Sequence, residues 1–538
     1  MSETGTEPRP RSRQVPDPVT AENVTYDPTM AQLRELAAPT GTETEYDSLA
    51  FVSEYRSRSA DRTRNAVDHD FDEDDRAILD AAVEATRDGE WLCLDRQVGR
   101  HPEASFCCRY YVPVEYARIA LSWATLFEPT DIEDPDFVTV QDPRQDEVAI
   151  RILPEEGFTA VLGSDYTGEA KKSFLRLFMY HVKQRGGLGL HAGSKIVRLF
   201  EDEAGASAAD ASDDGTASGG ASDVTGELAS DAASDATSAP TEIAQLFLGL
   251  SATGKSTLTA HGLWLEDPEE AVMVQDDVVA LLRDGAVAGS EGNGLYIKTY
   301  KLSAELQPDL HHAATDETAV LENVAVDPDG TVDFYDGETY TKNGRASIRR
   351  SCLESATEGI DVDHVDQIFF ITRHPLMPPI AKLDDAQAAA AFMLGESIET
   401  SAGDPERAGE AIRVVGTNPF IVGSEGAEGN RFQDLVADLD VDCFVINTGY
   451  VGEESHDVGV TETVTILTEV ARGTVDWIRD ERLHLTVPVH VPGLDIDAYY
   501  PPAIVENYDE AAAALRAERK EYLRTFPDLR AEIVRAAY

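Results

Sequence analysis

The chain has 538 residues, of which 100 are acidic and 45 are basic, so its formal net charge is −55. A surface with this excess of carboxylates repels nucleic acid and anionic membranes, and neither is expected as a partner. The length implies roughly two to four domains. Hydrophobic residues make up 42% of the sequence, which argues against disorder along the whole chain.

The acidic residues are spread along the chain, whereas only ten lysines occur, none of them before Lys171. We interpret this composition as adaptation to high salt, where screening shortens the range of repulsion between carboxylates. In such a chain the remaining lysines are candidates for chemical roles. The five cysteines form no C-x-x-C pair, which favours reduced thiols. A polar N-terminus and the lack of a run of about 18 apolar residues predict a soluble, cytoplasmic protein.

The first part of the sequence predicts mixed helices and strands. Residues 1–45 are polar and rich in Pro, Thr and Glu, which is typical of a flexible lead-in. Apolar residues at helical spacing predict helices over residues 74–88 and 114–127. Alternating apolar residues predict strands over 91–95 and 105–113.

Residues 201–240 consist almost entirely of small and acidic residues, a composition that cannot form a core. We predict that they form a disordered acidic insertion. After it the sequence alternates between strand and helix candidates. The predicted elements are strands over 243–248, 368–372 and 443–447, a hairpin over 324–334, and a charged amphipathic helix over 509–537.

The most specific motif follows the predicted strand 243–248. It reads G-L-S-A-T-G-K-S-T and matches the G-x-x-x-x-G-K-S pattern of a phosphate-binding loop. Backbone N–H groups of such a loop point at phosphate oxygens, Lys255 neutralises the β- and γ-phosphates, and Ser256 can reach Mg²⁺. A helix is expected from Leu258 onward. The residues predicted to bind nucleotide phosphates are Gly249, Leu250, Ser251, Ala252, Thr253, Gly254, Lys255, Ser256 and Thr257.

Three further segments carry chemically active groups. The adjacent Lys171 and Lys172 stand out in a chain that otherwise avoids lysine, His191 precedes a small-residue turn, and Asp276 and Asp277 follow an apolar strand. One amine, one imidazole and one carboxylate could jointly hold a divalent ion if a nearby cation lowers the pKa of the lysine. Taken alone, His191 also suits a satisfied interior histidine, and the lysines suit a solvated pair.

These motifs occur in one order along the chain. Residues 166–172 read Y-T-G-E-A-K-K, residues 297–303 read I-K-T-Y-K-L-S, and residues 322–345 run from E-N-V to T-K-N-G-R. Together with His191, the phosphate-binding loop and the paired aspartates, they resemble the ATP-type phosphoenolpyruvate carboxykinase family. The resemblance covers most of residues 50–535, interrupted by the acidic insertion.

The resemblance implies how the metals and the triphosphate would be held. Lys172, His191 and Asp277 would bind Mn²⁺, which also touches the γ-phosphate and the oxygen of oxaloacetate. Lys255 and Ser256 would bind the triphosphate and Mg²⁺.

The resemblance also implies substrate contacts. Arg345 would bridge the substrate and the γ-phosphate, and Tyr166 would face the organic acid. Arg58, in S-R-S-A, is similar to the arginine of the family's G-R-S-P motif and would bind a substrate carboxylate. Thr463 would lie on the nucleotide side. The catalytic residues implied are Lys172, Lys255 and Arg345.

By this resemblance the protein is expected to decarboxylate and phosphorylate oxaloacetate with ATP, giving phosphoenolpyruvate, CO₂ and ADP in gluconeogenesis. Two departures from the family pattern stand out. Ala252 replaces a loop glycine, and acidic residues at 453–457 replace basic ones beside the adenine, which leaves the choice of nucleotide base open. Two alternatives remain: a related P-loop kinase acting on another acceptor such as a serine hydroxyl, and a non-enzymatic nucleotide sensor.

The expected fold is a bilobal α/β enzyme whose active site lies between the lobes. Residues 46–187 would form an N-terminal substrate lobe and residues 188–538 a C-terminal lobe that carries the phosphate-binding loop. We expect a monomer whose partners are small molecules.

Overall fold

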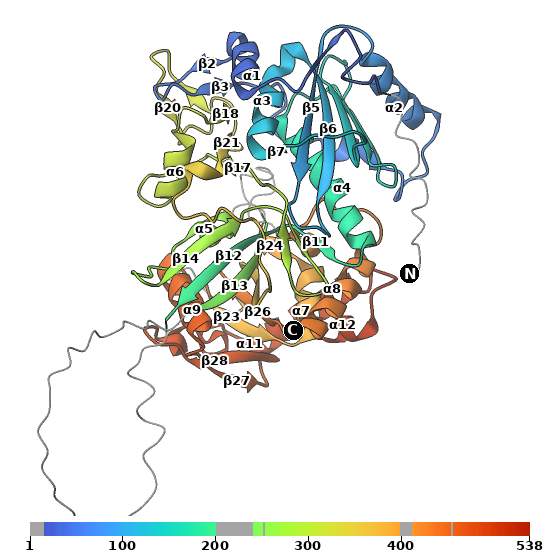
Figure 1. Ribbon diagram of the computed structural model, residues 1–538. Coiled ribbons are helices and arrows are strands. Elements are labelled where there is room, and N and C mark those ends of the chain that lie inside the picture. The colour runs from blue at the N-terminus through green and yellow to red at the C-terminus, as the bar shows by residue number, and fades with distance from the viewer. Residues whose placement is uncertain (1–14, 201–239, 251–252, 399–410, 453–455) are drawn as a thin grey trace, which may run out of the picture.

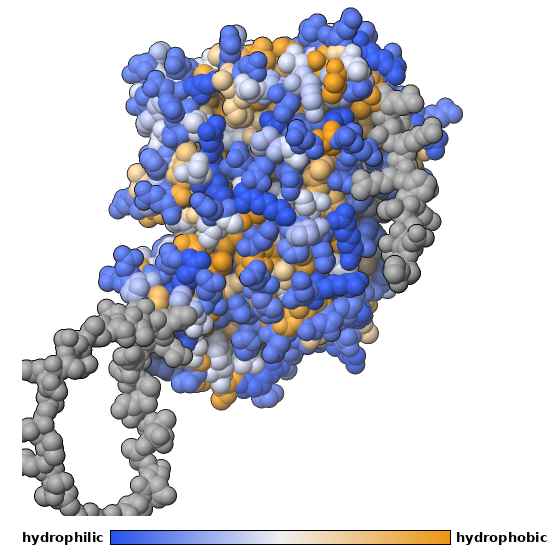
Figure 2. Space-filling model, in the orientation of Figure 1, coloured by the Kyte–Doolittle hydropathy of each residue, from blue (hydrophilic) through white to orange (hydrophobic). Residues whose placement is uncertain are grey.

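The computed structural model describes residues 15–200, 240–250, 253–398, 411–452 and 456–538. Figure 1 shows two lobes, one above the other, each built around a twisted sheet with helices against it. Hydrophilic residues dominate the face drawn in Figure 2, as the acidic composition requires.

The upper lobe is built on a mixed sheet in the order β1-β5-β6-β8-β10-β9-β4, with β7 beside β5. Successive residues of β5 point to opposite faces: Trp91 and Cys93 pack with α2, whereas Leu92 and Leu94 pack with α3 and α4. Because both faces are covered, the central strands β5, β6, β8 and β10 are buried nearly throughout. The strands are β1 (Val24–Tyr26), β4 (Thr63–Asn65), β5 (Trp91–Val98), β6 (Phe106–Pro113), β7 (Glu128–Pro129), β8 (Phe137–Asp142), β9 (Ala149–Leu153) and β10 (Phe158–Leu162). The helices are α1 (Met30–Ala37), α2 (Glu73–Ala85), α3 (Ala117–Leu126) and α4 (Thr167–Gln184).

The lower lobe is built on a sheet in the order β14-β12-β13-β22-β26-β23-β28-β27. Its alternating residues also divide between two cores, since Phe370 packs with α7 and α8 and Phe369 packs with α9. The strands are β12 (Ala192–Leu199), β13 (Thr241–Leu248), β14 (Glu270–Gln275), β22 (Gln367–Thr372), β23 (Ile380–Leu383), β26 (Asp442–Asn447), β27 (Asp476–Asp480) and β28 (Leu485–His490). The helices are α5 (Lys255–Ala260), α7 (Asp385–Leu394), α8 (Glu425–Leu439), α9 (Val460–Arg472), α10 (Pro501–Ile504), α11 (Tyr508–Leu523) and α12 (Ala531–Arg535).

A third sheet, in the order β17-β21-β18-β3-β2, lies with the upper lobe in Figure 1. Its strand β18 pairs in parallel with β3, so the sheet joins residues from both sides of the predicted boundary between 187 and 188. The strands are β2 (Thr42–Glu43), β3 (Leu49–Phe51), β17 (Gly294–Lys298), β18 (Val320–Glu322) and β21 (Arg345–Arg349), and α6 (Pro308–Ala314) packs against β21. Smaller sheets are formed by β11 (Leu188–Leu190), β15 (Val279–Leu281) and β16 (Val287–Gly289), by β19 (Ala325–Val326) and β20 (Val332–Asp333), and by β24 (Glu396–Ile398) and β25 (Ala411–Arg413).

The structure confirms the predicted strands, the helices near 74–88 and 114–127, and the hairpin near 324–334. The helix expected over 509–537 is instead two helices, α11 and α12, because Pro527 lies in the turn between them. The lead-in predicted for residues 1–45 is wrong for part of its described section, since β1 pairs with β5 and Leu33 of α1 is fully buried. Residues 201–239 of the predicted insertion lie outside the described part of the chain. Among the described helices, none combines the length and apolar character that a membrane span needs.

Candidate active site

Helix α4 carries the two adjacent lysines to the lower lobe. The helix begins directly after Tyr166, whose backbone is extended and whose ring lies against the first turn. A Cβ on Gly168 would lie 2.3 Å from this ring, so only glycine fits there. Lys171 and Lys172 follow in the next turn; the side chain of Lys171 is buried and that of Lys172 is only 15% exposed. The alternative of a solvated lysine pair is therefore wrong.

The carboxylate of Asp277, just beyond β14, is the point on which the site converges. Its oxygens lie 3.0 Å from Lys171 Nζ, 2.9 Å from His191 Nε2 and 3.3 Å from Lys255 Nζ, and Lys172 donates a hydrogen bond to it. Burial would raise the pKa of Asp277, but the three lysine ammonium groups hold it well below its ordinary value. Asp277 is therefore ionised and shared by more cations than it can neutralise.

Lys172 and Lys171 differ in pKa although they are neighbours. Burial lowers the pKa of Lys172 to about 8, an effect that Asp277 opposes and Lys171 reinforces. Lys171 also pairs with the buried Glu291 at 2.9 Å, and its two acidic partners raise its pKa despite burial. Lys172 is therefore the amine that can lose its proton and coordinate a cation.

His191 presents a nitrogen lone pair to the same place. Its Nδ1 lies 2.8 Å from the backbone oxygen of Thr417, which can only accept a hydrogen bond, so Nδ1 carries the proton. Burial, reinforced by Lys255, lowers the pKa of His191 to about 4, so the ring is neutral at physiological pH. The unprotonated Nε2 then faces an oxygen of Asp277 at 2.9 Å, and two acceptors at this distance need a cation beside them, a place that the Lys255 ammonium group takes at 3.5 Å from Nε2.

Lys172, His191 and Asp277 therefore fit a divalent cation by the chemistry of their donors: one amine of lowered pKa, one oriented imidazole and one carboxylate. In the described residues, no group of three or more His, Cys, Asp and Glu side chains forms a metal site. This trio differs from such a group because its third donor is a lysine.

The phosphate-binding motif lies beside this trio. Strand β13 ends at Leu248, and α5 begins at Lys255 directly after Gly254, whose φ of 103° requires glycine. Lys255 Nζ lies 3.5 Å from His191 Nε2 as well as 3.3 Å from Asp277. The strand, loop and helix thus occur in the predicted order, and Ser256 and Thr257 lie half-buried in the first turn of α5. Ser251 and Ala252 lie outside the described residues.

Arg345, at the start of β21, lies on the upper-lobe side. Its guanidinium donates a hydrogen bond of 2.9 Å to Asn343 and lies 5.4 Å from the Tyr296 ring, and its Nε is buried without a hydrogen bond among the described residues. The side-chain amide of Asn343 also lies 3.4 Å from the hydroxyl of Tyr166. Lys298 pairs with Arg345 across β17 and β21, and burial lowers its pKa to about 8.

The sequence analysis assigned no role to Lys298, although it lies in the I-K-T-Y-K-L-S segment. The scarcity of lysine could have drawn attention to it, because a half-buried lysine stands out in a chain with so few lysines.

Among the described residues, neither Arg58 nor Thr463 makes a hydrogen bond or ion pair with Asp277. The guanidinium of Arg58 lies 5.1 Å from the centre of the Phe420 ring, and Lys172 Nζ lies 4.7 Å from the same ring. Thr463 is buried in the first turn of α9, and its N–H donates to the backbone oxygen of Gly459. The structure gives no contact between Thr463 and the described residues of the phosphate loop.

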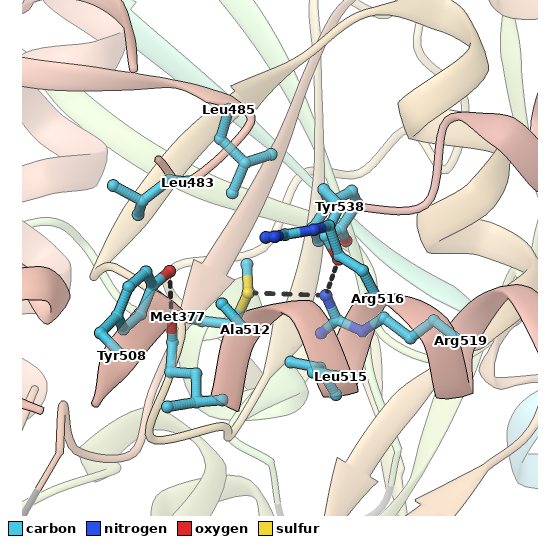
Figure 3. A pocket seen from close by; sticks show the side chains of 10 residues that line it. Met377, Leu483, Leu485, Tyr508, Ala512, Leu515, Arg516, Arg519 and Tyr538 are labelled. Carbon is cyan, nitrogen blue, oxygen red and sulfur yellow. Dashed lines mark hydrogen bonds between the residues drawn. The ribbon is translucent and has the colours of Figure 1, made fainter. Parts of the chain in front are cut away.

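A pocket elsewhere in the lower lobe is too small for a substrate. Figure 3 shows it beside α11, lined mostly by apolar side chains such as Leu483 and Leu485. Its volume of about 10 Å³ holds one water molecule at most. It is a packing gap.

The arrangement around Asp277 thus brings donor groups that suit a divalent cation next to the segment that carries the phosphate-binding motif, a combination typical of enzymes that transfer phosphoryl groups. A family model described as phosphoenolpyruvate carboxykinase matches residues 22–497. A relative from Aeropyrum pernix, named phosphoenolpyruvate carboxykinase (ATP), is 32% identical over 95% of this chain and 96% of its own length. Relatives of the same name from Mesorhizobium japonicum and Bradyrhizobium diazoefficiens are 29% and 28% identical over 66% and 70% of this chain, and 59% and 63% of their own length. The chain belongs to the phosphoenolpyruvate carboxykinase family.

Proposed function

We propose that the protein converts oxaloacetate and ATP into phosphoenolpyruvate, CO₂ and ADP, with a divalent cation held by Lys172, His191 and Asp277. The family assignment supports the reaction, and the convergence of three lysines and a neutral imidazole on the Asp277 carboxylate supports the position of the cation. We infer Mn²⁺ at this trio, because imidazole and amine are ligands that suit transition metals. We infer Mg²⁺ beside the Ser256 hydroxyl, because Mg²⁺ prefers oxygen ligands and phosphates.

The reaction needs positive charge at two places. Loss of CO₂ from oxaloacetate leaves an enolate, and the chemistry that a cation at the trio supplies is stabilisation of this negative charge. The enolate oxygen then attacks the γ-phosphate of ATP. Lys255 on the loop and Arg345 on β21 offset the charge that develops on the transferring group, and positioning supplies much of the remaining rate.

The two lobes divide the substrates in this proposal. The upper lobe, with Arg58, Tyr166 and Arg345, would hold oxaloacetate. The lower lobe would hold ATP at the loop between β13 and α5. Thr448 links the loop to the segment before α9, because its hydroxyl donates a hydrogen bond of 2.9 Å to the backbone oxygen of Thr253. Thr463 would also contact the nucleotide from the lower lobe.

The test is turnover by the purified protein in about molar KCl, a salt level suited to its acidic surface. With Mn²⁺, ATP and oxaloacetate, it should form phosphoenolpyruvate and release CO₂. Lys172→Met should abolish turnover, and the control Lys382→Met should not, because Lys382 pairs with Asp442 at the surface of the lower sheet. Consumption of ATP that does not depend on oxaloacetate would contradict the proposal and favour a kinase with another acceptor.

A further inference from the structure

Arg176 lies one helical turn beyond Lys172 on α4, so the two side chains share a face of the helix. Only 6% of Arg176 is exposed. Its guanidinium lies 5.5 Å from the centre of the Phe420 ring, which Arg58 also approaches at 5.1 Å and Lys172 at 4.7 Å. Three cationic side chains therefore surround one ring next to the proposed cation site.

Other buried arginines among the described residues have hydrogen-bond partners: Arg350 donates to the Gln275 side chain at 3.0 Å, and others pair with carboxylates. Arg109 lies 2.7 Å from Asp95, and Arg118 lies 2.6 Å from Asp165. For Arg176 the structure gives no hydrogen bond and no ion pair within 4.0 Å to any described residue. A buried guanidinium with unused donors is unfavourable unless another group satisfies it.

The nearest acid does not satisfy it. Glu169 is buried on the first turn of α4, and its carboxylate accepts a hydrogen bond of 2.5 Å from the backbone N–H of Ser59. Burial lowers the pKa of Arg176 to about 10, because the attraction of Glu169 is too weak to compensate and Arg58 adds repulsion. The guanidinium groups of Arg176 and Arg58 thus have one carboxylate, that of Glu169, to balance their charge. This region therefore carries excess positive charge, although the net charge of the protein is −55.

We propose that Arg176 is a substrate-binding residue that, together with Arg58, binds a carboxylate of the four-carbon dicarboxylate substrate. Arg176 lies one turn from Lys172, so this carboxylate would lie near the proposed cation. The arginines would then hold the substrate on one side and the cation on the other. The fork of N–H donors on a guanidinium matches two carboxylate oxygens at once. This inference rests on the proposed function for the identity of the substrate, and it adds a residue to which the sequence resemblance assigns no role.

The test compares three variants in about molar KCl. Arg176→Met removes the donors and keeps a long apolar side chain, and Arg176→Lys keeps the charge but loses the fork. The matched control is Arg185→Met at the end of the same helix, because Arg185 lies 4.3 Å from the Phe106 ring in an exposed position. We expect Arg176→Met to raise the KM for oxaloacetate about 10- to 100-fold, the range for losing a charged hydrogen bond, and to leave the KM for ATP within about twofold. Arg176→Lys should lie in between, and Arg185→Met should match the wild type.

A purely structural role would raise both KM values together or lower the melting temperature without this selectivity, and either result would overturn the proposal. An unchanged KM for oxaloacetate in Arg176→Lys would also overturn the proposal. This variant serves as the test if Arg176→Met does not fold. Calorimetric titration with oxaloacetate, without nucleotide or metal, separates this proposal from the proposed function. If the wild type binds oxaloacetate, Arg176→Met does not, and no phosphoenolpyruvate forms in the turnover assay, the proposed function fails and the binding role of Arg176 stands.

Discussion

Two clusters of buried charge, one around Asp277 and one around Glu396, show opposite ways of handling ions. At Glu396, Arg413 lies 2.6 Å from one carboxylate oxygen and Arg519 Nε lies 2.9 Å from the other. Arg519 also donates a hydrogen bond of 2.6 Å to the backbone oxygen of Tyr538. At Asp277, three lysines and an imidazole compete for one carboxylate.

Burial and shifted pKa values do not distinguish these clusters. The pKa of Glu396 is lowered to about 2, because the attraction of Arg519 outweighs burial, and the pKa of Asp277 is also well below its ordinary value. What distinguishes them is satisfaction of donors and acceptors. The geometry at Glu396 is that of a closed ion cluster, whereas His191 Nε2 has no proton, faces a carboxylate oxygen and has only a long contact of 3.5 Å with Lys255 Nζ. Such a weakly satisfied acceptor, and not a shifted pKa alone, indicates a site that takes a ligand.

The largest expected effect is loss of catalysis on changing the centre of the first cluster. Asp277→Asn removes a proposed metal ligand and the charge that organises the lysines, so kcat should fall about 10³-fold or more. Steady-state formation of phosphoenolpyruvate measures this. Asp442→Asn, which changes a half-exposed acid paired with Lys382 in the lower sheet, is the control. An Asp277→Asn variant with more than about a tenth of wild-type turnover would show that the carboxylate is not central.

A substitution in the cluster around Glu396 should lower the free energy of unfolding and leave catalysis unchanged. Arg519→Met leaves Glu396 buried with Arg413 as its partner, and the free energy of unfolding should fall by about 3 kcal/mol. Urea denaturation measures the loss, and Arg482→Met, which changes an exposed arginine paired with Asp509, serves as the control. A large drop in kcat in the folded Arg519→Met variant would erase the distinction between the two clusters.

The same cluster predicts a stability change in acid. The pKa of Glu396 lies below its unfolded value, so its stabilising contribution is present above about pH 4.5 and is lost as the pH falls toward about 2. The full contribution is about 3 kcal/mol, at about 1.4 kcal/mol per unit of pKa. Urea denaturation of the wild type and Glu396→Gln across this range should show a steeper loss in the wild type. Parallel curves would refute the assignment.

A smaller effect is expected at Lys195, whose ammonium nitrogen lies 2.5 Å from two backbone oxygens, those of Leu258 and His261, at the end of α5. Burial lowers its pKa to about 7, so above that pH the unfolded state binds a proton that the folded state does not. Stability should therefore rise with pH. Between about pH 7 and pH 8, the wild type should gain on the order of 1 kcal/mol relative to Lys195→Met, measured by urea denaturation. A constant difference between the two proteins would contradict this assignment.

Local motifs made part of the site predictable. Gly254 and Lys255 belong to a loop whose backbone geometry is encoded within a few residues, and Lys172, His191 and Asp277 each lie in a short recognisable segment. What sequence reasoning missed depends on contacts between distant segments. Phe420 lies far along the chain from the α4 cations that face it, and the oxygen that orients His191 belongs to Thr417.

The fold shows the same limit. Strands β5 and β22 were predicted because buried strands are apolar runs, whereas the pairing of β18 with β3 across the expected lobe boundary depends on long-range packing. The break between α11 and α12 could have been predicted from Pro527, since proline removes a helical hydrogen bond.

The most direct test of the central claim is electron spin-echo spectroscopy of the Mn²⁺-loaded protein in which only lysine is labelled with ¹⁵N. If Lys172, His191 and Asp277 hold the cation, the wild type should show a coupling between manganese and a lysine nitrogen, and Lys172→Met should lose it. A wild-type spectrum with manganese bound and no lysine coupling would contradict the account.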